Sequence, residues 1–210
     1  MNAHHTFLSL LCVAAAAMPA ATLFADEMTD SGMHAHQMHV QHESAGPLTL
    51  STVDYDTPDV QLVKDDGTTV SLRSELDDGR PVIMNFIFTT CTSICPLLSQ
   101  TFAAFAERLG PDRAKVHLVS ISVDPEQDTP ERLREYAQRF HAGPEWQHYT
   151  GTLEASLAAQ RAFDVYRGDK MSHTPVTLLR AAPGEPWRRL DGFATPDELL
   201  REFHTLVASH

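Results

Sequence analysis

Two cysteines separated by three residues are the side chains of this sequence best suited to chemistry. Cys91 and Cys95 lie in the segment Cys-Thr-Ser-Ile-Cys-Pro, directly after an apolar run of strand length. At the mouth of a helix this spacing puts the sulfurs about one turn apart, within range for binding one metal ion or, with an irregular first turn, for a disulfide. The free N–H groups of a helix N-terminus favour the thiolate, which is both metal ligand and nucleophile. The pair therefore predicts a metal site or a redox-active dithiol.

Two thiolates alone make an incomplete metal site, so we expect a third ligand from elsewhere in the fold. His173 is the best candidate, because it shortly precedes another strand-like run, Val176 to Leu179. A loop that enters a central parallel strand can approach the loop that carries the cysteines. Spacing alone favours the simpler alternative, a solvated loop histidine, since lone histidines are usually at the surface or hydrogen-bonded.

The surrounding pattern indicates the elements that position these residues. A turn at Asp65-Asp66-Gly67 between two short apolar runs predicts a β-hairpin over 60–63 and 69–72. Strands are predicted at 82–88, 116–123, 176–179 and 187–190, and helices at 94–109, from Pro130 with Thr129 as N-cap, at 153–163 and at 196–207. This alternation predicts an α/β domain over 51–210, with a central, mostly parallel sheet flanked by helices and an N-terminal β-hairpin.

Length and charge exclude several classes of protein. With 210 residues, 42% of them hydrophobic, the chain can form one or two domains with a real core. Its net charge of −12 repels phosphate backbones, so we expect no nucleic-acid partner. Only the first 25 residues contain an apolar stretch long enough to matter to a membrane, which excludes a multi-span membrane protein.

Residues 1–25 are predicted to be a signal peptide or a membrane anchor. Thr6 to Ala25 is almost wholly apolar and has no Asp, Glu, Lys or Arg. Pro19 interrupts the stretch and disfavours an unsupported membrane helix, but cleavage and anchoring both stay open. We therefore expect an exported, periplasmic protein, soluble or anchored to the outer face of the inner membrane. There, thiols normally become disulfides unless something protects or reduces them.

The order of motifs resembles the Sco/SenC family of copper-binding proteins over about residues 55–205. The shared features are the strand that ends at Cys91, the Cys-x-x-x-Cys-Pro loop, the segments 122–125 and 128–130, and the late His173 before a strand. The resemblance implies a thioredoxin-like fold, copper ligands Cys91, Cys95 and His173, and a role in assembling the copper centre of respiratory cytochrome c oxidase. With this resemblance, we expect His173 to be a copper ligand and no longer favour a solvated loop histidine.

The sequence departs from the family pattern at both loops. Thr92 and Ser93 stand where members usually have Pro and often Asp, which removes a negative charge and predicts a different metal affinity or redox potential. Ser172 precedes the histidine where Asp is usual, and Thr174-Pro175 follows it. A Thr-Pro before a strand resembles the loop that faces the cysteines in thioredoxin-like reductases, which keeps a second function open.

A segment rich in methionine and histidine lies between the export segment and the domain. Residues 26–50 are hydrophilic and typical of a flexible tail. Their ligand-type side chains are Met28, Met33, His34, His36, Met38, His39 and His42. Thioether and imidazole groups are copper ligands, so we expect the tail to collect or hand over copper. The alternative is a merely hydrophilic linker.

Copper agrees with the donor types, because thiolates select Cu(I) and an added imidazole also accommodates Cu(II). The leading hypothesis is a copper metallochaperone whose partner is a copper-accepting oxidase subunit or another copper chaperone. The second is a thiol-disulfide reductase in which Cys91 attacks and Cys95 resolves, acting on oxidised copper-site cysteines. A third is copper buffering or sensing. For Asp124 and Asp128 we favour structural roles over contacts to the metal ligands.

Overall fold

The computed structural model describes residues 47–209, so the predicted export segment and most of the Met/His-rich tail lie outside the described residues. The strands are β1 (Thr49–Val53), β2 (Gln61–Lys64), β3 (Thr69–Ser71), β4 (Val82–Ile87), β5 (His117–Ser122), β6 (Trp146–Gly151), β7 (Val176–Arg180) and β8 (Trp187–Asp191). The α-helices are α1 (Leu72–Leu76), α2 (Ile94–Leu109), α3 (Pro130–Arg139), α4 (Leu153–Ala162) and α5 (Pro196–Ala208), and short 3-10 turns cover Gly110–Lys115 and Lys170–Ser172.

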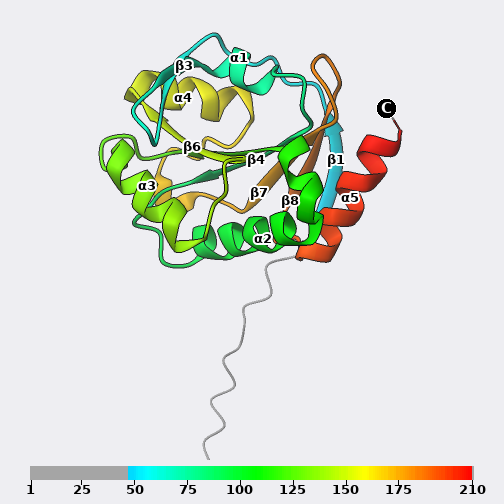
Figure 1. Cartoon of the computed structure of the whole chain (residues 1–210). Helices are drawn as coiled ribbons and strands as arrows, with labels where there is room; N and C mark the ends of the chain where they lie inside the picture. Colours follow the sequence, from blue (N-terminus) through cyan, green and yellow to red (C-terminus); the bar gives the residue numbers. More distant parts are fainter. Residues whose placement is uncertain (1–46, 210) are drawn as a thin grey trace, which may run out of the picture. The chain divides into compact units, whose positions relative to one another are not determined.

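The eight strands form one mixed sheet in the order β1-β8-β7-β4-β5-β6-β2-β3 (Figure 1). The α/β, thioredoxin-like class is confirmed, with helices on both faces and the predicted hairpin at β2 and β3. The expectation of a mostly parallel sheet is wrong in detail. Of the seven pairings between neighbouring strands, only β4 with β5 and β5 with β6 are parallel.

The pairing of β7 with β4 is antiparallel because α4 does not carry the chain back to the other end of the strands. Ser156 on α4 donates its hydroxyl to the backbone oxygen of Ser122 at the end of β5, 2.8 Å away. Phe163, just after α4, packs on Phe86 near the end of β4, with ring centroids 6.2 Å apart. The chain therefore enters β7 beside the carboxyl end of β4, and β7 runs antiparallel to β4.

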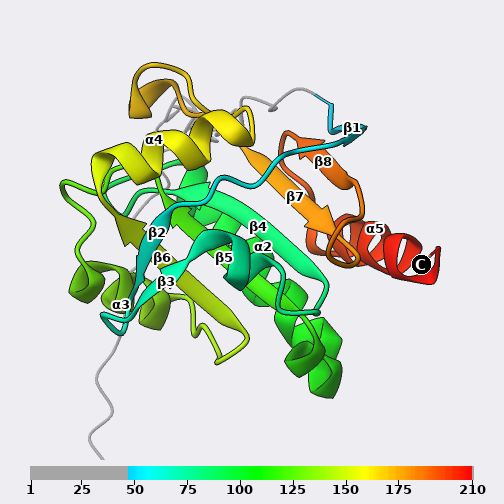
Figure 2. The same cartoon turned by 90° about the horizontal axis from the view of Figure 1, so that it is seen from above.

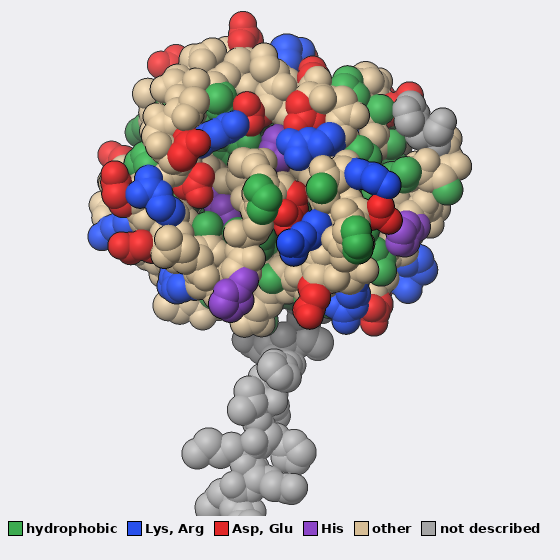
Figure 3. Space-filling view, viewed as in Figure 1, with side chains coloured by type: hydrophobic (Ala, Val, Ile, Leu, Met, Phe, Trp, Pro, Cys, Tyr) green, Lys and Arg blue, Asp and Glu red, His purple; other side chains and the backbone are tan. Residues whose placement is uncertain are grey.

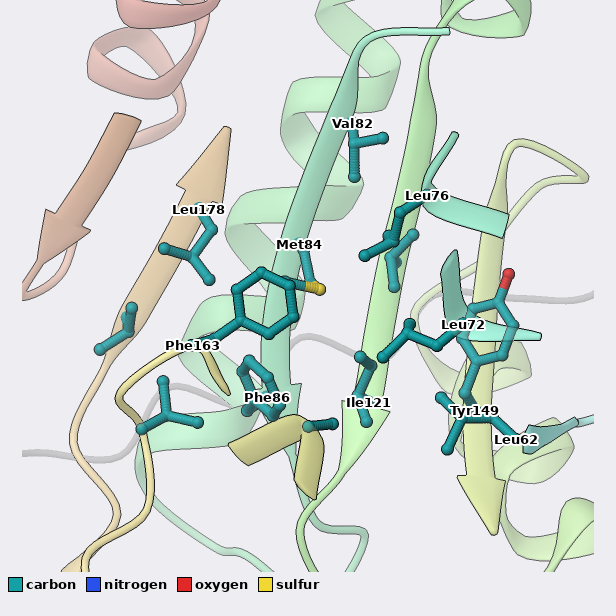
Figure 4. Packing of buried hydrophobic residues seen from close by; sticks show 14 of the residues in the cluster. Leu62, Leu72, Leu76, Val82, Met84, Phe86, Ile121, Tyr149, Phe163 and Leu178 are labelled. Carbon is teal, nitrogen blue, oxygen red and sulfur yellow. The ribbon is translucent and has the colours of Figure 1, made fainter. Parts of the chain in front are cut away.

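Helices cover both faces of the sheet (Figures 1 and 2). Successive residues of β4 pack against opposite layers. Val82, Met84 and Phe86 join the core under α1 and α4, where Figure 4 shows them beside Phe163 and Leu178. Ile83 joins the core formed with α2 and α5. A strand buried on both faces reads as a continuous apolar run, which is why β4 is evident in the sequence.

Three elements escape the sequence pattern. In β1, four of the five residues are exposed, and the strand includes Thr49 and Leu50, which the sequence places in the tail. The strand β6 has the sequence WQHYTG, with no regular apolar alternation, yet its side chains are largely buried. The helix α1 has five residues, too few for a periodic pattern.

The surface carries both signs of charge. On the face drawn in Figure 3, acidic and basic side chains are interspersed, so the net charge of −12 does not gather there in one acidic patch. Within residues 47–209, no helix is both long and apolar enough to cross a bilayer.

Candidate metal centre

The two cysteines occupy the junction of β4 and α2. Cys91 lies in the connecting loop, where its backbone N–H donates to the oxygen of Phe88 at 3.1 Å. Cys95 is the second residue of α2, and its backbone N–H donates to the Sγ of Cys91 at 3.4 Å. Both are free thiols. The predicted placement at a helix N-terminus is confirmed, and the free N–H groups of that helix face the Cys91 sulfur.

The two thiols have opposite pKa shifts. Burial alone would raise the pKa of Cys91, but hydrogen bonds from the N–H groups of Cys95, Ser93 and Ile94 outweigh burial and hold it below the usual value of 9.0. Burial raises the pKa of the Cys95 thiol well above that value, and the neighbouring Cys91 and Asp128 charges raise it further. Cys91 is thus the more acidic thiol of the pair.

A buried carboxylate anchors the cysteine loop, residues 88–93 between β4 and α2. Asp128 is fully buried. It accepts hydrogen bonds from the hydroxyl of Thr89 at 2.5 Å, from the Thr89 N–H at 3.1 Å and from the hydroxyl of Ser122 at 2.6 Å. Burial raises the pKa of Asp128, and these hydrogen bonds oppose that effect. Asp128 thus positions the backbone two residues before Cys91, and this supports the structural role expected for it.

His173 reaches the same end of the sheet because β7 is antiparallel to β4. Thr177 pairs with Asn85, so the loop before β7 lies beside the loop after β4. In a parallel pair that loop would lie at the opposite end of the strands, so the expected route through a parallel strand is wrong. Cys91 and His173 line one small cavity of about 70 Å³, together with Phe88, Thr90, Thr92, Ser93, Ile94, Lys170 and Met171.

One hydrogen bond determines which nitrogen of His173 can bind a metal. The imidazole is buried, and its Nε2 lies 3.0 Å from the backbone oxygen of Phe86. A carbonyl can only accept, so Nε2 carries the proton and Nδ1 keeps a free lone pair. Burial lowers the pKa of His173, with a further contribution from Arg167, against the effect of the Phe86 hydrogen bond. The neutral ring is the metal-binding form.

A salt bridge holds the histidine loop, residues 163–175 between α4 and β7. The Nζ of Lys170 lies 2.5 Å from Oδ2 of Asp124, in the loop that follows β5. The same ammonium group lies 5.8 Å from the ring centroid of Phe88. Lys170 therefore ties the histidine loop to the loop after β5. No local sequence pattern joins Lys170 to Asp124, since 46 residues separate them.

The predicted ligands are neighbours without forming a finished metal site. Cys91 contacts the backbone of Cys95 and shares a cavity with His173. Among residues 47–209, however, no group of three His, Cys, Asp or Glu side chains is arranged to hold a metal ion. The three-ligand set of Cys91, Cys95 and His173 therefore stays a prediction.

These features define a class of protein: a thioredoxin-like domain with a dithiol after its central strand and a histidine loop beside it. Solved structures share this fold. The crystal structure of Arabidopsis thaliana ScoI with copper bound is 27% identical, has a TM-score of 0.62, and is matched over 73% of this chain and 99% of that one. BsSco, described as a member of the Sco family of cytochrome c oxidase assembly proteins with a disulfide switch, has a TM-score of 0.62 at 23% identity, covering 76% of this chain and 98% of that one.

The chain belongs to the SCO1/SenC family, whose model matches residues 52–208. This confirms the family resemblance. An SCO1 protein homologue of Bacillus subtilis (strain 168) is 29% identical over 113 residues, which are 53% of this chain and 58% of the relative. The match thus spans less than two thirds of that relative.

Proposed function

We propose that this chain is an exported copper metallochaperone. It binds copper through Cys91, Cys95 and His173, and it delivers the ion to the copper site of a respiratory cytochrome c oxidase, or prepares that site. The observation that carries the proposal is the cavity lined by Cys91 and His173, with the backbone N–H of Cys95 on the Cys91 sulfur. Copper in the Arabidopsis relative supports the metal, and the oxidase-assembly family of BsSco supports the recipient.

The donor set suits copper in both oxidation states. Thiolates are soft ligands for Cu(I), and the free Nδ1 of His173 adds a ligand that Cu(II) also accepts. Cys91 is the thiol that deprotonates first, because hydrogen bonds from backbone N–H groups lower its pKa. Cys95 is buried and holds its proton more tightly, so loading copper releases that proton.

The position of the ligands suits transfer. They lie on two loops and on the first turn of α2, all at the same end of the strands, so a partner's ligand can approach from solvent and replace them one at a time. Copper then passes between proteins without being released as a free ion. The apolar residues 6–25 support export, so we propose that the domain works in the periplasm, either cleaved and soluble or anchored to the outer face of the inner membrane.

Copper titration tests the proposal. The chain from Asp26 onward is fully reduced and titrated anaerobically with Cu(I) and, separately, with Cu(II). To remove copper bound by the tail, the titration is repeated in a Ser-tail variant, in which the seven Met and His residues of 26–46 are replaced by serine. We expect about one ion at the domain site, loss of that site in Cys91→Ser, and weaker Cu(II) binding in His173→Ala. The exposed His204 on α5 provides a matched control, His204→Ala.

Absence of a domain site in the Ser-tail variant would refute the metallochaperone proposal. Equal Cu(II) affinity in His173→Ala and His204→Ala would remove His173 from the ligand set and leave a two-cysteine site.

A second function, thiol-disulfide reduction, is favoured by the opposite pKa shifts of the two cysteines. The Cys91 thiolate attacks a substrate disulfide and forms a mixed disulfide, and one substrate thiolate leaves. Cys95 then loses its proton and attacks the Cys91 sulfur, which frees the second substrate thiolate. The substrate gains two electrons, and Cys91 and Cys95 end as a disulfide. His173→Ala should leave reduction of glutathione disulfide largely intact while crippling Cu(II) binding; equal loss of both would mean that the roles are confused.

We also infer that the tail supplies copper to this site. Thr49 at the start of β1 pairs with Asp191, and Asp191 pairs with Val176 at the start of β7. The chain therefore enters the sheet at the same end of the strands as the loop that carries His173. Neighbouring strands lie about 4.8 Å apart, and β1 is three strands from β4. His42 precedes Thr49 by seven residues, a segment that spans at most about 25 Å when extended. The chain length thus allows tail ligands to reach the cysteine loop.

A further inference from the structure

Met171 is a thioether on the cavity of the proposed copper site. Its side chain is 76% exposed, the highest value among the large hydrophobic residues that are exposed in residues 47–209. It lines the same cavity as Cys91 and His173. A methionine left in solvent gains nothing from the burial of its apolar side chain. Packing within the described domain therefore does not explain this residue type here.

The backbone around Met171 is held in place. The N–H of Met171 donates to Oδ1 of Asp169 at 2.8 Å, and the N–H of Ser172 donates to the Asp169 backbone oxygen at 3.0 Å. The preceding Lys170 is joined to Asp124 by the salt bridge described above. These bonds define the 3-10 turn Lys170–Ser172, so the exposed thioether is carried at a defined place beside the cavity.

The chemistry of a thioether is selective. Its sulfur is neutral and soft, has no proton to lose, and binds Cu(I) in preference to harder ions. It is a weaker ligand than a thiolate, so an ion that it holds can pass on to Cys91. A residue with these properties suits an entry point, where an ion must bind briefly and leave again.

We propose that Met171 is the outer ligand of the site, which holds Cu(I) as the ion enters and leaves the cavity lined by Cys91 and His173. This inference rests on the proposed copper function. On entry, a bond from Cu(I) to the Met171 sulfur forms while a bond to the donor's ligand breaks. The Cys91 thiolate then replaces the thioether. Copper stays Cu(I) in both steps, and no electron is transferred. Exit follows the same steps in reverse.

The rival explanation is that Met171 is an apolar contact for a partner protein. Two substitutions separate the alternatives. Met171→Leu keeps the apolar character and removes only the sulfur, whereas Met171→Ser removes both. Leu153 on α4 is also exposed and does not line this cavity, so Leu153→Ser is a matched control for the loss of an exposed apolar side chain.

The experiment measures Cu(I) exchange with a small chelator, so that no partner surface contributes. In the Ser-tail variant, which excludes the tail thioethers, Cu(I) bicinchoninate is mixed with reduced protein and transfer is followed by stopped-flow absorbance. We expect Met171→Leu and Met171→Ser to slow transfer in both directions by about tenfold, equivalent to ~1.4 kcal/mol in the barrier. Leu153→Ser should exchange at the parent rate, and the Cu(II) affinity of Met171→Leu should be unchanged. Thermal unfolding confirms that each variant is folded.

Each other outcome overturns the inference in a recognisable way. If Met171→Leu exchanges Cu(I) at the parent rate, Met171 is not a copper ligand, although the copper function stands. Slow exchange in Met171→Ser with a normal rate in Met171→Leu would show that shape and polarity matter and sulfur does not. If the parent itself takes up no Cu(I) that depends on Cys91, the proposed function and this inference fall together.

Discussion

The two loops that meet at the proposed copper site are held in different ways. On the cysteine side, Cys95 at the start of α2 is fully buried, and the buried Asp128 accepts hydrogen bonds from three donor groups of Thr89 and Ser122. The histidine loop is tied down by the partly exposed salt bridge of Lys170 and by the hydrogen bond from His173 to Phe86. The cysteine loop also belongs to a hydrophobic cluster that contains Ile87, Phe88, Leu133 and Tyr136.

This difference indicates how the site closes on an ion. Moving the cysteine loop would break buried hydrogen bonds and core packing, each of which is costly. Moving the histidine loop breaks the ion pair of Lys170 with Asp124 and the single hydrogen bond from His173 to Phe86, each of which contributes about 1 kcal/mol. The fold therefore sets the positions of the two sulfurs, and in the proposed copper site we expect the histidine side to be the one that adjusts.

The sharpest test removes the anchor of the cysteine loop. Asp128→Ala leaves the N–H and hydroxyl of Thr89 and the hydroxyl of Ser122 without their acceptor. We expect the free energy of unfolding to fall by about 3 kcal/mol, measured by urea denaturation. The matched variant Asp124→Ala, which removes the ion pair that holds the histidine loop, should cost about 1 kcal/mol. Equal losses in the two variants would contradict the difference between the loops.

The second test concerns the two thiols in the metal-free, reduced chain. Iodoacetamide reacts with the thiolate, so Cys91 should be modified about a hundredfold faster than Cys95 at neutral pH. The pKa of Cys91 is lowered, so its rate should rise with pH and level off with a midpoint below 9.0. Mass spectrometry of the peptides follows both sites. A midpoint at or above 9.0 would mean that the backbone N–H groups do not stabilise the Cys91 thiolate.

A smaller effect is expected when the histidine loop loses its anchor. Asp124→Ala frees Lys170, so that His173 must be ordered when copper binds. Cu(II) affinity should fall about fivefold, equivalent to ~1 kcal/mol, as measured by competition titration. The alkylation rate of Cys91 should not change, because the cysteine loop keeps its own anchor. A slower alkylation rate would show that the two loops are coupled through Asp124.

The smallest effect concerns the tail. In the Ser-tail variant, copper stoichiometry should fall below that of the parent, or the domain site should load about two- to threefold more slowly at low copper, an effect of well under 1 kcal/mol. The affinity of the domain site should stay the same, because its ligands are unchanged. If both stoichiometry and loading rate match the parent, the segment is only a linker.

The sequence predicted the strands that are buried on both faces and the helix that begins with a clear N-cap. The apolar runs at β4 and β5 and the N-cap at Thr129 are each written within a few residues. It missed β6, because its buried residues include His148 and Thr150, which are polar. It also could not show that Asp124 meets Lys170, since that contact depends on how distant loops pack. Met171 was not singled out either, because exposure beside a cavity has no local signal.

The sequence by itself determined the chemistry: two thiols at the mouth of a helix, a late histidine before a strand, and the motifs of the SCO1/SenC family. Only the tertiary structure decided how these groups meet. The direction of β7 is the deciding feature, because β7 is buried on both faces, and a strand buried in this way is a continuous apolar run in either direction. That direction depends on where the chain leaves α4, and it places His173 beside Cys91 at the same end of the strands. The type of each residue can be read from the sequence alone, but the end of the sheet at which a loop emerges depends on the whole fold.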